Sequence, residues 1–273
     1  MKEHAIQSPR DDRTTPSSYQ AVILAAGAGS RLRESRESAP KPLTEVAGFT
    51  LLEHAVRVCH DAGVSDIVVV LGYEGDEIRM RLPELVARHE MPIRAATNED
   101  WQLGNGASVL AAAPYVHSPF LLMMCDHLIH PDLLTKLIGA DRPSKNCTLA
   151  IDPDPSRCRD VEEATKILFD GPRIAAIGKS LPSYDAIDTG VFLCRELLFD
   201  ALREAAADGQ HSLSEAVQLL ATRGEVTWVS SDGLPWIDVD TPDDLQYARG
   251  LLAGGVWPAN PGVPAVDDVA ARI

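Results

Sequence analysis

The chain lacks the features that would place it in a membrane or in an oxidising compartment. Apolar runs such as Phe120 to Cys125 are far shorter than the roughly 20 residues that span a bilayer. Residues 1–19 contain no apolar stretch, so no secretory signal is visible. The five cysteines are odd in number and include no C-x-x-C pair, which argues against a disulfide framework or a zinc site. We therefore expect a cytoplasmic protein without a membrane segment.

Positive charge is also scarce. Lysine and arginine total 25 against 40 aspartates and glutamates, which gives a formal net charge of −15 at pH 7. The charges of residues 1–19 balance, so the acidity belongs to the rest of the chain. Nonspecific nucleic-acid binding needs a basic face, so we expect no nucleic-acid partner. An anionic substrate would have to be attracted by a local cluster of cations.

The first half of the chain alternates predicted strands and helices. Unbroken apolar strands such as Ile67 to Leu71 predict a parallel sheet covered on both faces. Strands are predicted over 20–25, 66–71, 92–97 and 119–125, and helices over 51–62, 75–83, 104–113 and 131–139. This pattern indicates a doubly wound α/β fold, in which ligands bind outside the carboxyl ends of the strands.

The second half has a mixed pattern. Predicted strands lie at 146–151, 163–169, 173–178, 186–193 and 225–229, and helices at 195–206 and 212–222. Thr241 or Asp240 is expected to cap a final helix that ends near residue 252. Residues 1–19 are predicted to be a disordered arm, and 255–273, with three prolines, a tail. Between them we expect one domain, 20–254, with a nucleotide-binding half (20–130) and an acceptor and metal half (131–254).

The first predicted strand ends in a loop of very small residues. A ligand can lie directly on the backbone N–H groups of such a loop. Two cations follow, Arg31 at once and Lys41 between two prolines. The loop comprises Ala25, Ala26, Gly27, Ala28 and Gly29. A bare backbone with two cations beside it is suited to a polyphosphate.

The glycines alone are also compatible with a tight strand-to-helix turn. The dinucleotide fingerprint requires a third glycine where this chain has Leu32, which argues against an NAD-dependent oxidoreductase. No G-K-[ST] closes the loop, so the Walker pattern is absent as well.

Carboxylates follow two of the apolar strands. Asp126 comes directly after the run that ends at Cys125, a costly position unless the carboxylate has a task. Mg²⁺ is a suitable partner, since it favours carboxylates together with substrate phosphates. The alternative is an aspartate that caps the next turn. Asp238 and Asp240 follow Trp236, and both face one metal only if the strand has ended there. Asp238 is the favoured ligand, because Asp240 could instead cap the final helix.

Polar residues occur at other predicted strand ends. Lys166 and Lys179 could bind a phosphate or could be solvated. Asn98 and the loop Trp101 to Ser108 precede a helix, whose N–H groups and asparagine side chains could read a base edge. The alternative for this loop is a helix cap with a turn. His127 could contact an acceptor or be structural.

The order of these segments resembles the nucleotidyltransferases that make activated sugars and alcohols. The shared signature is L-x-A-G-x-G-[ST]-R-[LM] followed by P-K-[PA]-L, and the resemblance extends over about residues 20 to 254. More narrowly, the chain resembles the inositol-1-phosphate cytidylyltransferases. That likeness rests on Gly104-Asn105-Gly106 with Ser108, Asp126-His127, Glu163 to Lys166, Ile177 to Lys179, Asp188-Thr189-Gly190, Leu213-Ser214-Glu215 and Trp236 to Asp240. Sugar-nucleotide enzymes usually carry G-T-A in place of Gly104-Asn105-Gly106 and G-D in place of Cys125-Asp126.

The resemblance implies a Rossmann-like nucleotidyltransferase fold, with a mainly parallel sheet and a smaller acceptor-binding subdomain. It implies Mg²⁺-dependent transfer of a cytidylyl group from CTP to a small alcohol phosphate such as inositol 1-phosphate, giving a CDP-alcohol and pyrophosphate. Phosphocholine, an alkylphosphonate or a sugar 1-phosphate are alternative acceptors, and a non-catalytic nucleotide-binding module is an alternative of another class. Many relatives are fused to a membrane phosphotransferase. No such segment is visible in this sequence, so we expect a stand-alone enzyme here, with a homodimer as an open possibility.

The resemblance also assigns roles to residues. Arg31 and Lys41 would contact the leaving phosphates, and Lys179 the acceptor phosphate, which makes these three the catalytic cations. Asp126, Asp238 and Asp240 would bind Mg²⁺. The acceptor would contact Lys166, Lys179, His127, Asp188 and Thr189. The nucleotide would contact Leu24, Ala25, Ala26, Gly27, Gly29, Ser30, Asn98, Gly104, Asn105, Gly106 and Ser108.

Overall fold

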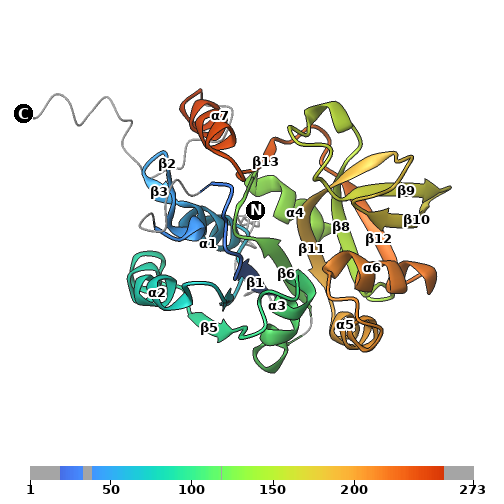
Figure 1. Cartoon of the computed structure of the whole chain (residues 1–273), viewed down its shortest axis with the longest axis horizontal. Coiled ribbons are helices and arrows are strands. Elements are labelled where there is room, and N and C mark those ends of the chain that lie inside the picture. Colours follow the sequence, from blue (N-terminus) through green and yellow to red (C-terminus); the bar gives the residue numbers. More distant parts are fainter. Residues whose placement is uncertain (1–18, 33–38, 118, 255–273) are drawn as a thin grey trace, which may run out of the picture.

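A computed structural model describes residues 19–32, 39–117 and 119–254, and it has a three-layer α/β architecture (Figure 1). The predicted arm and tail lie outside these residues, except for Tyr19, whose hydroxyl donates to Asp141 at 2.8 Å. The central sheet has the order β10-β9-β11-β6-β1-β4-β5, and β8 pairs with both β11 and β12. Its strands are β1 (Gln20–Ala25), β4 (Ile67–Leu71), β5 (Ile93–Thr97), β6 (Phe120–Met124), β8 (Cys147–Asp152), β9 (Lys166–Asp170), β10 (Arg173–Gly178), β11 (Ala186–Cys194) and β12 (Val226–Ser230).

Helices cover both faces of this sheet and enclose two separate apolar cores. The first face carries α1 (Leu51–Asp61), α2 (Gly75–His89) and α4 (Pro131–Gly139). The second carries α3 (Asn105–Ala112), α5 (Leu197–Ala207) and α6 (Leu213–Thr222). The last helix is α7 (Pro242–Ala253), and short 3-10 helices occur at Lys41–Leu43 (η1), Ala113–Tyr115 (η2) and Pro155–Arg157 (η3).

Strand β1 shows why these residues form a central strand. Successive side chains point to opposite faces of a sheet. Ile23 accordingly packs in the first core and its neighbours Val22 and Leu24 in the second. Because both faces are buried, the strand has no polar alternation. This agrees with the predicted doubly wound sheet.

The order in which the parallel strands are added to the sheet reverses beside β1. The chain passes from β1 through β4 to β5 on one side, and then returns through α3 to β6 on the other side of β1. A crevice forms at such a switch point, outside the carboxyl ends of the two strands. The small-residue loop after β1 and Asp126 after β6 both lie at this place.

The second half continues the same sheet through β11, which pairs antiparallel with β6, β8 and β9. The register with β8 shifts between Asp188 and Phe192, which marks a β-bulge. Two small sheets lie outside the main one. They are β2 (Glu45–Val46) with β3 (Phe49–Thr50), and β7 (His127–Ile129) with β13 (Trp236–Asp238).

Two predicted boundaries were wrong. Helix α2 continues through Pro83 to His89, although proline cannot donate to the carbonyl four residues earlier. The burial of Leu85 and the contacts of Arg88 with buried Glu53 stabilise the extra turns. Strand β9 begins at Lys166 and not at residue 163, because the amide of Ala164 donates to Asp160 in a turn.

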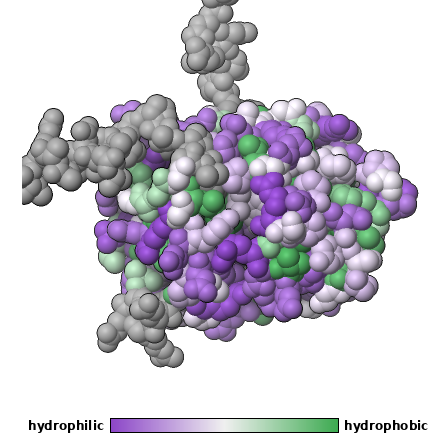
Figure 2. Space-filling view, turned by 90° about the horizontal axis from the view of Figure 1, so that it is seen from above, coloured by the Kyte–Doolittle hydropathy of each residue, from purple (hydrophilic) through white to green (hydrophobic). Residues whose placement is uncertain are grey.

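The surface agrees with the acidic, polar composition. Figure 2 shows a face on which hydrophilic residues predominate, with apolar residues confined to separate patches. Among the described residues no helix is long and apolar enough to cross a membrane. All five cysteines are free, and Cys125 and Cys194 are buried in the cores as expected.

Candidate active site

Two cavities meet at the switch point. The smaller has a volume of about 200 Å³ and lies against the small-residue loop after β1. The larger, of about 870 Å³, lies between β11, the segment 156–165 and the segment 235–251, which includes β13 and part of α7. Asp126 and Asp240 line both cavities. Two ligands could therefore bind side by side with these carboxylates between them.

The smaller cavity is lined by backbone and cations. Among the predicted nucleotide-binding residues, Leu24, Ala25, Gly27, Gly29 and Ser30 line it, together with Arg31 and Lys41. Gly29 has a φ of +58°, and a Cβ built on it would overlap the Cβ of Lys41. Only glycine therefore permits the loop and Lys41 to lie so close.

Lys41 forms the centre of a charge cluster. Its Nζ lies 2.5 Å from both Asp126 Oδ2 and Asp240 Oδ1 and 4.0 Å from Asp238 Oδ1. The side chain is only 6% exposed. Arg31 pairs with the other oxygen of Asp240 and lies 3.8 Å from Asp160. The cluster thus combines two cations with the three predicted metal ligands.

The electrostatics of this cluster shift several pKa values. Burial alone would lower the pKa of Lys41, but the charges of Asp126, Asp238 and Asp240 outweigh it and raise that pKa. Burial would raise the pKa of Asp126, yet Lys41 and His127 bring it below its usual range. For Asp238, burial and the neighbouring Asp126 charge raise the pKa despite the nearby cations.

His127 connects the acidic cluster to β11. Its Nδ1 lies 2.8 Å from the carbonyl oxygen of Thr189, and its Nε2 lies 3.5 Å from Asp238. Burial opposes the charged imidazole, but Asp238 and Asp126 outweigh it and raise the pKa of His127 to about 10.

The donor set suits a divalent cation. Ligand atoms of Asp126, His127 and Asp238 all lie within 4.8 Å of one another. Oδ1 of Asp238 is buried and has no hydrogen-bond partner among the described residues, which leaves an acceptor oxygen free for an ion. Carboxylate oxygens are the ligands that Mg²⁺ prefers.

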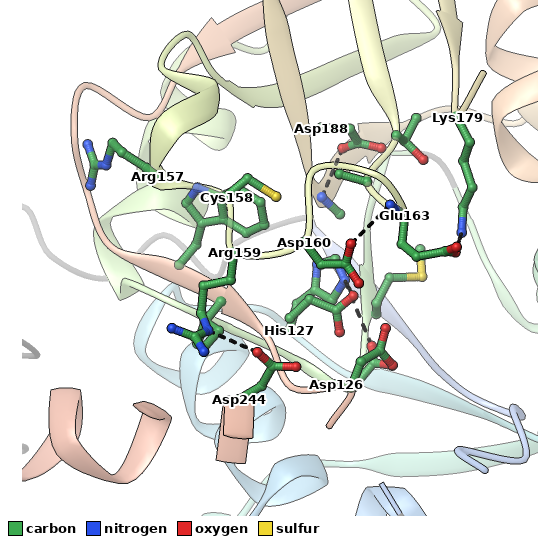
Figure 3. Close-up of a pocket in the computed structure, with 18 of the residues that line it drawn as sticks. Asp126, His127, Arg157, Cys158, Arg159, Asp160, Glu163, Lys179, Asp188 and Asp244 are labelled. Atoms are coloured by element: carbon green, nitrogen blue, oxygen red, sulfur yellow. Dashed lines mark hydrogen bonds and ion pairs between the residues drawn. The ribbon is translucent and has the colours of Figure 1, made fainter. Parts of the chain in front are cut away.

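The larger cavity is rich in charged side chains on opposite walls (Figure 3). On one wall Lys179 lies 3.3 Å from Glu163. Asp188 lies nearby, and burial raises its pKa to about 7 although the amide of Gly190 donates to it. Arg159 and Asp244 pair at 2.9 Å on the other wall.

Sequence reasoning missed the cations of the loop between β8 and β9. Arg157 and Arg159 line the larger cavity, and the guanidinium of Arg159 stacks 4.4 Å from the ring centre of Tyr247. The loop follows no motif of fixed spacing, so its approach to α7 depends on the tertiary fold. The only available signal was the closely spaced pair of arginines in Arg157-Cys158-Arg159-Asp160.

Several predicted ligand-binding residues contact other parts of the protein instead of the cavities. Nζ of Lys166 donates to the carbonyls of Glu162, Ala164 and Lys179, which uses all three of its N–H groups. The side chain of Thr189 donates to Ala150. Asn98 donates to Ser108 in the interior, and the carbonyl of Ala26 accepts from Tyr73.

The segment Gly104-Asn105-Gly106 packs against α6. A Cβ on Gly104 or Gly106 would lie 2.7 or 2.6 Å from the carbonyl oxygen of His211, so both glycines permit close packing. Asn105 lines the larger cavity, and its side-chain oxygen accepts from the amide of Leu213 at the start of α6. Much of this segment therefore serves to start a helix and to form a turn, which was the alternative to recognition of a base edge.

Comparison with known proteins places this arrangement in a family. The model of the MobA-like NTP transferase domain matches residues 21–223. The chain belongs to this family. The predicted class of enzyme, a nucleotidyltransferase, is confirmed by this match.

Individual relatives of this NTP transferase domain carry more specific names. A "Bifunctional IPC transferase and DIPP synthase" of Rubrobacter xylanophilus is 38% identical over 92% of this chain and 56% of its own length. A protein of the same name from Thermococcus kodakarensis is 34% identical over 85% of this chain and 50% of its own length. The chain thus spans about half the length of these curated relatives.

A solved structure is similar over nearly its whole chain. The inositol-1-phosphate CTP transferase from T. maritima superposes with a TM-score of 0.77 at 26% identity, covering 90% of this chain and 98% of that one. A UDP-glucose pyrophosphorylase, at 16% identity and a TM-score of 0.72 over 86% of this chain and 98% of that one, shares the fold. The predicted nucleotidyltransferase fold is confirmed.

Proposed function

We propose that this NTP transferase domain transfers the cytidylyl group of CTP to inositol 1-phosphate and releases pyrophosphate. The observation that carries the proposal is the meeting of two cavities at Asp126 and Asp240, beside Lys41 and Arg31. A triphosphate and a phosphorylated acceptor need such adjoining sites. The names of the relatives described above and of the T. maritima structure support cytosine and inositol over other bases and acceptors.

The nucleophile is an oxygen of the acceptor's own phosphate. A phosphate monoester has a second pKa of about 6, so this oxygen is already anionic near pH 7. It attacks the α-phosphorus of CTP, a new O–P bond forms, and the bond from that phosphorus to the pyrophosphate oxygen breaks. The protein therefore has to position two anions and neutralise charge, and it needs no enzymic nucleophile.

The cations of the smaller cavity fit the leaving group. Arg31 and Lys41 project beside the loop of Gly27 and Gly29, where the backbone N–H groups are available to phosphates. We assign both cations to the β- and γ-phosphates. Lys41 is fixed by three carboxylates, so its ammonium group is oriented before any substrate arrives.

Asp126 and Asp238 are the proposed ligands of Mg²⁺, with Asp240 as a further ligand. Oδ1 of Asp238, which has no hydrogen-bond partner among the described residues, and the proximity of Asp126 support this choice. Bound Mg²⁺ would supply positive charge to the α-phosphate and to the attacking oxygen.

The larger cavity is the proposed site of the acceptor. Lys179 is assigned to its phosphate, and Asp188 to a hydroxyl of the inositol ring. With a pKa near 7, the Asp188 carboxyl can either donate or accept a hydrogen bond to a hydroxyl. Lys166 is no longer proposed as a direct contact, because backbone carbonyls occupy its ammonium group.

A pyrophosphate-release screen tests the proposal. Each of ATP, CTP, GTP and UTP is paired with inositol 1-phosphate, phosphocholine, aminoethylphosphonate and glucose 1-phosphate in the presence of Mg²⁺. We expect CTP with inositol 1-phosphate to give the highest kcat/KM, at least about tenfold above any other pair. A higher value for another pair would overturn the choice of base or acceptor.

A further inference from the structure

The bulge in β11 is built by three successive residues. Gly190 has a φ of +76°, and its amide donates to Oδ1 of Asp188 at 2.8 Å. The hydroxyl of Thr189 donates to the carbonyl of Ala150 on β8 at 2.8 Å. These bonds fix the bulge in one conformation, in which the carbonyl of Thr189 points at His127.

Gly190 leaves space for the imidazole ring of His127. A Cβ built on this glycine would overlap both Nδ1 and Cε1 of the ring. The positive φ is also a conformation that other residues rarely adopt. The bulge therefore provides both a hydrogen-bond acceptor for the ring and the room in which it lies.

The other edge of the ring faces the acidic cluster. His127 and Asp238 are direct cross-strand partners in the β7–β13 pair. Nε2 lies 3.5 Å from Oδ2 of Asp238 and 4.0 Å from Oδ1 of Asp126. Oδ1 of Asp238, on the other side of that carboxylate, has no hydrogen-bond partner among the described residues.

We propose that His127 is a positioning residue, which is seated by the bulge of β11 and orients Asp238 for metal binding. The inference rests on the proposed function, since it takes Asp238 as a Mg²⁺ ligand. Mg²⁺ takes oxygen ligands, so the imidazole acts through Asp238 and not as a ligand itself. The ring is 13% exposed and each of its nitrogens has a partner within the protein, so we assign its role to Asp238, although the ring also lines the larger cavity.

Two substitutions of His127 distinguish the hydrogen bond at Nδ1 from the contact of Nε2 with Asp238. His127→Asn retains a donor near the position of Nδ1 and loses the contact with Asp238. His127→Gln places its amide nearer to the position of Nε2 and can still reach Asp238. Gly190→Ala displaces the ring without altering it. His60→Asn, at an exposed histidine on α1, is the matched control.

The readout is the binding of Mn²⁺ to the chain, followed by the electron paramagnetic resonance signal of the free ion, with Mg²⁺-dependent turnover as a second measure. We expect His127→Asn and Gly190→Ala to weaken Mn²⁺ binding by about 10- to 100-fold, and to raise the Mg²⁺ concentration for half-maximal rate, while the KM for the acceptor stays near that of the unaltered chain. His127→Gln should recover part of the affinity. Thermal unfolding identifies the variants that are folded. If His127→Asn or Gly190→Ala does not fold, the Mn²⁺ affinity of His127→Gln is compared with that of His127→Phe instead.

Equal Mn²⁺ affinity in the folded variants and the unaltered chain would overturn the proposal. So would a nitrogen hyperfine coupling from His127 to the bound ion, because it would make the histidine a ligand. If the unaltered chain binds no Mn²⁺, the metal assignment of the proposed function fails instead, and the role of His127 fails with it.

Discussion

Lys41 has an unusual environment for a lysine. It is buried, and its ammonium group contacts carboxylates from two distant parts of the chain, Asp126 after β6 and Asp240 before α7. A buried charge is stable only when it is paired in this way. Because the same carboxylates are the proposed metal ligands, Lys41 and a metal share one set of anions.

We predict that Lys41→Ala and Asp126→Ala each lower pyrophosphate release by at least about 10²–10³-fold, because each removes a charge that acts on the reacting phosphates. The fold should be retained, since both groups lie at the edge of a cavity that admits water. Steady-state rates and circular dichroism check both statements. Turnover near that of the unaltered chain in either variant would contradict the assigned roles.

Two glycines of the same loop should respond differently to an added methyl group. At Gly29 the methyl would overlap Lys41 at a φ of +58°, so we expect Gly29→Ala to lower stability by about 1–2 kcal/mol. At Gly27 no atom lies within 4 Å of the added Cβ, so Gly27→Ala should retain full stability. Thermal unfolding of the pair is the measurement, and equal losses would show that the contact with Lys41 is not what requires glycine.

At the scale of elements, the loop between β8 and β9 is joined to α7 through Asp244. This carboxylate accepts from the amide and hydroxyl of Thr241 in the capping box of α7, and from Arg159 in the loop. Burial alone would raise the pKa of Asp244, but the bonds with Thr241 and Arg159 outweigh it and lower that pKa.

A lowered pKa gives a stabilisation that is present above the unfolded value of about 3.9 and is lost as the pH falls through the folded value. We therefore expect Asp244→Asn to reduce stability by about 1 kcal/mol at pH 7, the usual worth of a helix cap. The difference from the unaltered chain should shrink below about pH 4.

Urea unfolding at pH 7, 5 and 3.5 measures this dependence. Asp243→Asn is the control, because Asp243 is an exposed neighbour in the same first turn of α7. A loss that is equal at all three pH values would mean that the charge of Asp244 is unimportant, and a loss equal to that of the control would contradict the account.

Most helices and strands of the first half could be predicted, because its helices have an apolar face and strands such as β4 are unbroken apolar runs. α4 starts and ends where the pattern indicated, at residues 131 and 139. The β2–β3 hairpin and β7 were not foreseen, since two- or three-residue strands have no periodicity to detect. The bulge of β11 was also beyond reach, because a register shift depends on the partner strand.

At the scale of the whole molecule, the fold brings together the carboxyl ends of strands that are far apart in the sequence. The loop after β1 and Asp126 could be predicted to meet, since ligands of such sheets bind at the switch point. The position of Asp240 beside Lys41 could not be predicted, because it depends on how β13 and α7 pack. The surroundings of Lys166 could not be predicted for the same reason, as only the folded loop reveals the carbonyls around it.

We propose that the two cavities hold CTP and a phosphorylated acceptor on either side of the acidic cluster. Phosphorus NMR of the chain with CTP, inositol 1-phosphate and Mg²⁺ tests this arrangement. We predict a new diphosphate diester and pyrophosphate in equal amounts, with both substrates consumed together. Release of CMP with pyrophosphate, or no reaction while both substrates persist, would contradict the claim.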